Sequence, residues 1–172
     1  MTTSIVFTFI GADKPGLVEK LTAIVSQHGG NWLESRMSQL AGQFAGITQV
    51  QVSNSNVEQL RQALSDISGD DLTVVVQPGT VHSHGQKIKH VNLSLIGNDR
   101  PGILKELSSA LATRNINVCE LSTRVTSAPM TAEPLFEAMA DIQVPQSQDL
   151  DELSEKLDEI ANMLSVDISL DC

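Results

Sequence analysis

One short stretch with chemical potential occurs twice in this sequence. Gly-Ala-Asp-Lys-Pro-Gly-Leu occupies residues 11–17, and Gly-Asn-Asp-Arg-Pro-Gly-Ile occupies residues 97–103. In each copy we expect the leading Gly to end a strand in a backbone conformation that other residues resist, and the Pro to be the first helical residue. Such a strand-to-helix turn exposes backbone N–H groups at the positive end of a helix dipole. These groups can hold an anion such as a carboxylate.

An aspartate in each copy, Asp13 or Asp99, changes which ligand the turn would prefer. Its carboxylate is expected first to stabilise the helix entry by accepting backbone N–H bonds, with direct ligand contact as the alternative. A carboxylate there would repel a bare anion but attract an ammonium group, so a zwitterionic amino acid fits better than a simple anion. A duplicated fold also repeats its structural turns, so a purely structural role of both turns stays open.

Polar residues of the expected second strand in each half complete the set of binding candidates. Asn31 and Asn117 follow a helix stop, where an Asn can serve a turn as well as a ligand. Arg36 and Arg124 lie farther along the same segments. These two arginines are expected to pair with nearby acids rather than to clamp a ligand.

No pattern typical of catalysis, cofactor binding or metal binding is found among the other polar residues. Cys119 and Cys172 lie far apart and form no Cys-x-x-Cys pair. His82 and His84 lack a Cys, Asp or Glu nearby and are expected in a solvated linker. The sequence also lacks a nucleophile elbow, a Walker loop and a zinc-protease helix motif. We therefore expect a non-enzyme without a cofactor or a metal site.

The composition narrows the range of partners. The chain of 172 residues carries 21 acidic and 11 basic side chains, for a net charge of −10, and its basic residues form no cluster. Direct nucleic-acid binding is therefore not expected, because a phosphate backbone needs clustered Lys and Arg. The N-terminus has no signal-peptide pattern, and no segment approaches the ~20 apolar residues of a membrane span. A cytoplasmic protein without membrane contact is the simplest expectation.

The two copies of the turn lie in halves that have the same order of elements. Apolar alternation and helical spacing predict strand, helix, strand, strand, helix and strand in each half. The first half has expected strands at 4–10, 32–40, 44–52 and 72–76 and helices at 17–28 and 57–67, the second helix capped by Ser55. The second half has expected strands at 90–96, 118–126, 136–144 and 166–170 and helices at 103–114 and 150–164.

The halves also align residue by residue, which indicates an internal duplication. Gly11 meets Gly97 at an offset of 86, and the offset becomes 92 where Phe44 meets Phe136. The extra residues fall in a longer connection at 127–134, which has no counterpart in the first half. The order of elements is the ferredoxin-like split βαβ plan, an α+β fold. Right-handed crossovers would place both helices on one face of a four-stranded antiparallel sheet.

The turns, the order of elements and the Asn before each second strand together resemble the ACT domain, a family of small regulatory modules that bind amino acids. The resemblance covers two tandem copies, expected at 1–78 and 89–172 with a linker at 79–88. It implies ligand contacts by Asp13, Pro15, Gly16, Leu17 and Asn31 in the first half, and by Asp99, Pro101, Gly102, Ile103 and Asn117 in the second. Family ligands usually sit between two ACT units, which come from one chain or from two chains of a homo-oligomer.

Within this family, the chain is similar to the glycine cleavage system transcriptional repressor group, whose members are little more than two ACT domains and a short linker. The resemblance implies a small amino acid as ligand, with glycine first, and a protein partner such as a DNA-binding transcription activator. The alternative is an amino-acid-binding regulatory subunit of a biosynthetic enzyme. The acetolactate synthase small subunit is such a protein, but it carries one ACT unit, whereas the turn occurs here in both halves. An enzyme of ferredoxin-like plan is disfavoured because no catalytic set is found.

Overall fold

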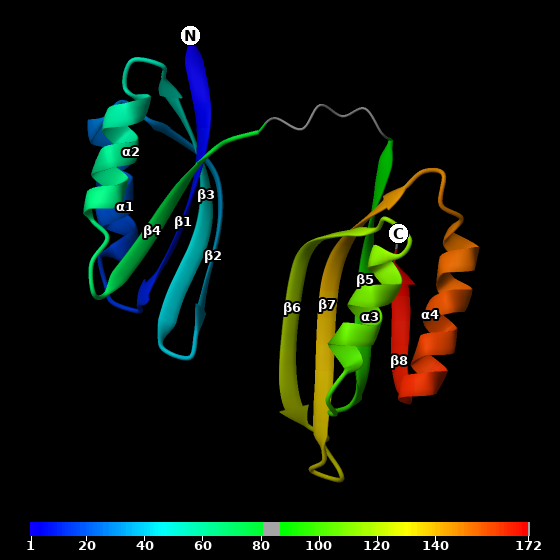
Figure 1. Cartoon of the computed structure of the whole chain (residues 1–172). Coiled ribbons are helices and arrows are strands. Elements are labelled where there is room, and N and C mark those ends of the chain that lie inside the picture. Colours follow the sequence, from blue (N-terminus) through cyan, green and yellow to red (C-terminus); the bar gives the residue numbers. More distant parts are fainter. Residues whose placement is uncertain (81–86, 172) are drawn as a thin grey trace. The chain divides into compact units, whose positions relative to one another are not determined.

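The computed structural model describes residues 1–80 and 87–171, and the chain divides into two compact units. Figure 1 shows that each unit consists of one sheet with two helices against one of its faces. None of the helices in the described ranges is long and apolar enough to cross a membrane. Three residues singled out in the sequence lie outside the described residues, namely His82, His84 and Cys172.

The N-terminal unit has the predicted βαββαβ order. Its elements are β1 (Thr2–Ala12), α1 (Leu17–Gln27), β2 (Asn31–Leu40), β3 (Gln43–Ser53), α2 (Val57–Asp66) and β4 (Leu72–Pro78). The four strands form one antiparallel sheet in the order β2-β3-β1-β4. The two strands at the centre, β1 and β3, are therefore the first and third strands of the unit, which is the ferredoxin-like arrangement.

The C-terminal unit repeats this arrangement. Its elements are β5 (Ile88–Asn98), α3 (Ile103–Ala112), β6 (Asn117–Ser127), β7 (Pro134–Pro145), α4 (Leu150–Leu164) and β8 (Val166–Asp171). The sheet order is β6-β7-β5-β8, and every neighbouring pair is antiparallel. The predicted fold class, two tandem α+β units with helices on one face of an antiparallel sheet, is confirmed.

Alternation along the first strand of each unit separates a buried sheet face from an outer face. Ile5, Phe7 and Phe9 of β1 are buried and belong to one core cluster with side chains of α1 and α2. Val91, Leu93 and Leu95 of β5 do the same against α3 and α4. Burial of each large side chain stabilises a fold by about 1.5–3 kcal/mol. The opposite face of each sheet carries no helix of its own unit (Figure 1).

The start of α2 differs from the predicted capping box. The N-cap is Asn56 rather than Ser55, and no side chain caps this helix end within the described residues. The Ser55 hydroxyl instead contacts Ser53 Oγ at 3.0 Å and donates to Asn56 Oδ1 at 3.1 Å. Because Ser and Asn side chains compete for local hydrogen bonds, the helix begins one residue later than the box predicts.

Candidate functional site

Both predicted turns enter their helices through a glycine in the left-handed conformation. Gly16 and Gly102 are the N-cap residues, with φ values of 89° and 99°. A Cβ at either glycine would meet no atom within 4 Å, so the backbone conformation and not the available space requires glycine there. The prediction that Pro15 and Pro101 are the first helical residues was wrong. The chain changes direction at the following glycine, and α1 and α3 begin one residue after it.

The glycine that opens each turn serves a different purpose from the predicted one. Gly11 and Gly97 lie inside the strand ladders and have no positive φ. A Cβ on Gly11 would lie 2.7 Å from the backbone oxygen of Asp71, and a Cβ on Gly97 would lie 2.4 Å from Val166 Cγ1. Both glycines therefore allow a close approach of the neighbouring strand rather than an unusual backbone conformation.

The helix starts that follow the turns have no side-chain caps. Among the described residues, no side chain accepts a hydrogen bond from the first turn of α1 or α3. The predicted capping by Asp13 and Asp99 was therefore wrong, and both carboxylates are exposed. Their backbones instead anchor the turns, since Asp13 N–H donates to Gly42 O at 3.0 Å and Asp99 N–H donates to Pro134 O at 2.8 Å. A helix start without a side-chain cap and an exposed carboxylate thus lie within a few residues of each other in both units.

The basic residue of each turn contacts a residue that lies shortly before the last strand of its unit. Lys14 Nζ lies 2.8 Å from Asp71 Oδ2, and the hydrogen bond and charge of Lys14 lower the pKa of the Asp71 carboxyl. Arg100 Nη2 donates to Met163 O at 3.3 Å, in the last turn of α4. This carbonyl is among those that the helix leaves without an internal partner. The two cations therefore have structural partners and do not point to a ligand.

The hydrophobic residue after each glycine belongs to the core to a different degree. Leu17 is half-buried and packs against the core cluster of its unit. Ile103 is only 2% exposed and lies within the core cluster of the C-terminal unit. Ile103 as a whole is therefore enclosed by its unit, backbone included, whereas Leu17 keeps part of its surface exposed.

The two asparagines lie far from the turns of their own units. Asn31 opens β2 and pairs with Gln51 of β3. Gln51 pairs on its other side with Ser4, near the start of β1. The turn follows Ala12 at the other end of β1, about 26 Å from Ser4 at the usual rise per strand residue. Asn117 occupies the corresponding place in β6, opposite Gln143. The structure therefore brings together the four turn residues of each predicted set but separates them from the asparagine.

The two predicted arginine pairs are present on the outer sheet faces. Arg36 Nη1 lies 3.1 Å from Glu34 Oε1, and Arg124 Nε donates to Glu137 Oε2. The side chains of Arg36 and Glu34 are both 62% exposed, whereas Glu137 is only 24% exposed. The expectation that these arginines neutralise neighbouring acids is confirmed. The N-terminal pair is a surface ion pair, and the C-terminal pair is partly shielded by the sheet.

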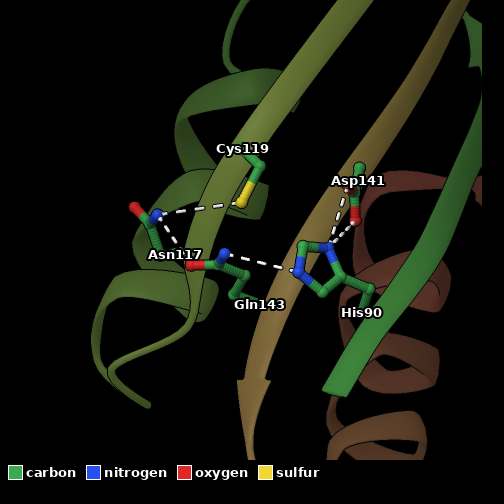
Figure 2. A network of polar contacts seen from close by, with 5 residues as sticks. All are labelled: His90, Asn117, Cys119, Asp141 and Gln143. Carbon is green, nitrogen blue, oxygen red and sulfur yellow. Dashed lines mark hydrogen bonds and ion pairs between the residues drawn. The ribbon is translucent and has the colours of Figure 1, made fainter. Parts of the chain in front are cut away.

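A further cluster on the outer face of the C-terminal sheet was missed in the sequence. His90, Cys119 and Asp141 come from β5, β6 and β7, and their potential ligand atoms all lie within 4.8 Å of one another (Figure 2). The three residues share no short spacing, so a search for local metal motifs cannot find them. Strand register and a bulge in β6 assemble the cluster. The only sign of the cluster in the sequence is that alternation along the strands places His90 and Asp141 on the outer sheet face.

Comparison with family models defines the class of protein. An ACT domain model matches residues 3–77, and a second ACT domain model matches residues 87–167. The chain therefore belongs to the ACT domain family and carries two copies of the domain in tandem. The family expectation based on the duplicated turns is confirmed.

Curated relatives indicate which regulators this chain resembles. The glycine cleavage system transcriptional repressor of Escherichia coli (strain K12) is 26% identical over 125 residues. The match covers 72% of this chain and 66% of the relative, slightly less than two thirds of the relative's length. The repressor of the same name from Shigella flexneri matches to the same extent. The chain is thus an ACT-domain regulatory protein related to these repressors.

Two solved structures share the fold over nearly the whole chain. An unknown protein from Galdieria sulphuraria superposes with a TM-score of 0.87 at 24% identity, covering 99% of this chain and 98% of that one. A protein provisionally assigned as a glycine cleavage system transcriptional repressor has a TM-score of 0.71 at 23% identity, with 99% and 97% coverage. At this identity the likeness establishes the fold.

Proposed function

We propose that this protein is a non-catalytic sensor of a small amino acid, glycine first. It would control transcription of glycine cleavage metabolism through a protein partner. The observation that carries the proposal is the duplicated helix entry. Each entry combines a left-handed glycine, a helix start without a side-chain cap and an exposed aspartate. Membership of the ACT family and the relation to the repressors support the same function.

The chemistry of the turn suits both ends of an amino acid. Backbone N–H groups at the helix start, with Gly16 or Gly102 at the N-cap, would receive the ligand carboxylate. The carboxylate of Asp13 or Asp99 would attract the ligand ammonium group. Pro15 and Pro101 would limit the conformations of the loop before the ligand binds, because proline fixes its own φ. The exposed part of Leu17 would border the ligand in the first unit, and ligand contact at Ile103 in the second would require this enclosed residue to become accessible.

A site that also used Asn31 or Asn117 would need more than one unit. Within one unit the asparagine lies at the opposite end of the sheet from the turn. The second unit could be the other half of this chain or part of another copy in a homo-oligomer. Ligand binding would then stabilise one arrangement of units over others, which is how a small molecule can alter affinity for a partner.

The charge of the chain supports a protein partner over DNA. A net charge of −10 opposes direct binding to a phosphate backbone. A DNA-binding transcription activator would supply the DNA contacts instead, and such a partnership would place the protein in the cytoplasm. We take the domain limits for this function to be 1–78 and 89–172, with 79–88 as the linker.

Calorimetry with the twenty amino acids tests this function. The wild-type chain should bind one or a few of them, with glycine among the ligands. Gly16→Val and Gly102→Val should weaken binding at their own turns at least tenfold, because a β-branched residue does not adopt a φ near +90° without strain. Gly29→Val is the matched control, since Gly29 also has a positive φ of 67° but lies beyond the other end of α1.

Four results would contradict the proposal. A panel without any binding would exclude the sensor, and normal binding in both turn variants would make the turns purely structural. Equal loss in the Gly29→Val control would mean that backbone strain anywhere disrupts binding. Co-purification of a metabolic enzyme in place of a transcription activator would favour the regulatory-subunit alternative.

A further inference from the structure

The cluster on the outer face of the C-terminal sheet combines three different ligand groups. His90 Nδ1 lies 3.0 and 3.1 Å from the two oxygens of Asp141, and the Cys119 thiol belongs to the same group of ligand atoms. His90 and Cys119 are exposed, and Asp141 is half-buried. An imidazole nitrogen, a sulfur and a carboxylate oxygen thus lie close together on the outer sheet face (Figure 2).

Strand register explains why these residues meet. Gln143 of β7 pairs with His90 of β5 on one side and with Asn117 of β6 on the other. Asp141 lies two residues before Gln143 on the same strand and hence on the same sheet face. The ladder between β6 and β7 shifts register between Val118 and Glu120, so Cys119 is the extra residue of a β-bulge. A bulge re-aims the side chain of its extra residue, which here is the thiol.

The neighbouring amides hold two of the three candidate ligands. Asn117 Nδ2 donates to Cys119 Sγ at 3.9 Å and to Gln143 Oε1 at 3.4 Å. Gln143 Nε2 lies 3.4 Å from His90 Nε2. Asparagine and glutamine therefore link the thiol side of the cluster to the imidazole side (Figure 2). Such outer hydrogen bonds orient metal ligands in known sites.

A shallow hollow beside the cluster adds further acids. It has a volume of about 430 Å³, and its lining includes Asp141, Glu120 and Asp171. The three carboxylates raise the local concentration of cations by long-range attraction. Glu120 faces Asp141 across the β6–β7 ladder and could supply a further oxygen ligand, and a water molecule could do the same.

We propose that His90, Cys119 and Asp141 form a binding site for a borderline-soft divalent cation such as Zn²⁺. Sulfur and imidazole ligands favour zinc and its neighbours over Ca²⁺ or Mg²⁺, which prefer oxygen ligands. A thiolate and a carboxylate together balance the two positive charges of the ion. In a tetrahedral zinc site the ligand atoms lie about 3.3–3.7 Å apart. In the structure the three ligand atoms lie within 4.8 Å of one another, and rotation of the side chains can bring them to the spacing of a zinc site.

The N-terminal unit lacks this site and provides an internal comparison. The residues at the corresponding strand positions are Ser4, Leu33 and Gln49. Gln49 Nε2 donates to Ser4 Oγ at 2.9 Å, which replaces the contact between imidazole and carboxylate by one between two neutral groups. Leu33 occupies the same bulge as Cys119 but offers no ligand atom. The proposal therefore predicts one cation for each chain, bound by the C-terminal unit.

Titration of the reduced, metal-free 172-residue chain with Co²⁺ tests the site. One equivalent should bind and produce the absorption of a cobalt–thiolate bond, and Zn²⁺ should displace it. Cys119→Ser should abolish the thiolate absorption. His90→Gln and Asp141→Asn should each weaken binding at least tenfold, as loss of one of three protein ligands does. Cys172→Ser and His28→Gln are the matched controls for thiol and imidazole, and both should bind like the wild type.

The test separates this site from other sources of metal binding. Absence of the thiolate absorption in the wild type, or its persistence in Cys119→Ser, would overturn the proposal. Loss of the absorption in Cys172→Ser would show that the metal binds Cys172, and this result would also overturn the proposal. Circular dichroism of every variant before metal is added should match the wild type, and Asp141→Asn keeps the test valid if His90→Gln unfolds. Amino-acid binding is measured separately, so either proposal can fail alone.

Discussion

The two units share their helix-entry turns but differ on their outer sheet faces. Gly16 and Gly102 have nearly the same backbone conformation, and both helix starts lack side-chain caps. On the outer faces, in contrast, Ser4 and Gln49 of one unit correspond to His90 and Asp141 of the other. The duplicated fold has therefore kept its turns while the chemistry of the sheet faces has diverged. The proposed amino-acid site uses the shared feature, and the proposed cation site uses the divergent one.

The exposed apolar residues of the two outer faces are similar but not identical. Ile10, Ile47 and Val75 of the N-terminal sheet are 51%, 48% and 47% exposed. Ser169 takes the place of Val75 in the C-terminal sheet, where β8 pairs with Ser94 of β5. Ile10 and Ile47 have exposed apolar counterparts in Ile96 and Met139, so among these positions the two outer faces differ at Val75. A shared scaffold can carry different surfaces because the outer face does not contribute to the core.

The largest expected effect comes from the glycines that the two units use in the same way. Gly11→Ala and Gly97→Ala should each destabilise their unit by about 2–3 kcal/mol, because the new methyl group overlaps the neighbouring strand. Gly69→Ala, where a Cβ meets no atom within 4 Å, is the control and should change stability by less than about 0.5 kcal/mol. Thermal or urea unfolding measures the difference. Equal stability of all three variants would contradict the close approach of the strands.

The second prediction transfers the cation site from one unit to the other. The triple variant Ser4→His, Leu33→Cys and Gln49→Asp should raise the Co²⁺ stoichiometry from one to two per chain, because both bulges have the same register. The double variant without Leu33→Cys is the control and should remain at one equivalent with thiolate absorption. If the triple variant binds only one ion, residue type and register do not suffice to make the site.

The third prediction compares the two arginine–glutamate pairs. Arg124→Gln should lower the free energy of unfolding by about 0.5–1 kcal/mol, and Arg36→Gln by about 0–0.5 kcal/mol. The C-terminal pair should matter more because Glu137 is better shielded from water than Glu34. Urea unfolding at low and at high salt checks the order. A larger loss in Arg36→Gln would show that burial does not control the difference.

The smallest effect concerns the contacts of the basic turn residues. Lys14 lowers the pKa of the exposed Asp71 carboxyl below its ordinary 3.8, mainly by a hydrogen bond and then by its charge. A lowered folded-state pKa adds stability above the unfolded value, and this is lost as the pH falls through the folded value. In NMR titrations Lys14→Met should return the Asp71 pKa towards 3.8. Arg100→Met should leave it unchanged, since Arg100 bonds to a backbone carbonyl.

The fold could be predicted because its signals are local and duplicated. Period-two and helical spacing give the order of elements, and the repeated Asp-x-Pro-Gly turn gives the family. The details of the turn could not be predicted in the same way. Whether the helix begins at Pro15 or at Leu17 depends on a backbone angle that residue type alone does not determine. The close contact of Gly97 with Val166 depends on two strands that are distant in sequence.

For the candidate sites too, residues adjacent in sequence could be grouped in advance, whereas residues brought together by strand pairing could not. The turn residues are adjacent in sequence, so their grouping was foreseeable, although their separation from Asn31 follows only from the strand order. The cluster around Cys119 depends on three strands and on one bulge that shifts the register. A bulge adds a single residue to a strand and leaves no clear compositional mark. The sequence therefore groups the turn residues but contains no local motif for the cluster of His90, Cys119 and Asp141.

The shared turn is the centre of this account, and titration of the isotopically labelled chain with glycine tests it most directly. In two-dimensional NMR, the backbone amides of residues 16–19 and 102–105 should shift with a common saturation curve, because these groups form the helix starts. Amides at the middle of β3 and β7 should shift less. Glycine-dependent shifts confined to other parts of the chain, or no shifts with any amino acid, would contradict the assignment of ligand binding to the two turns.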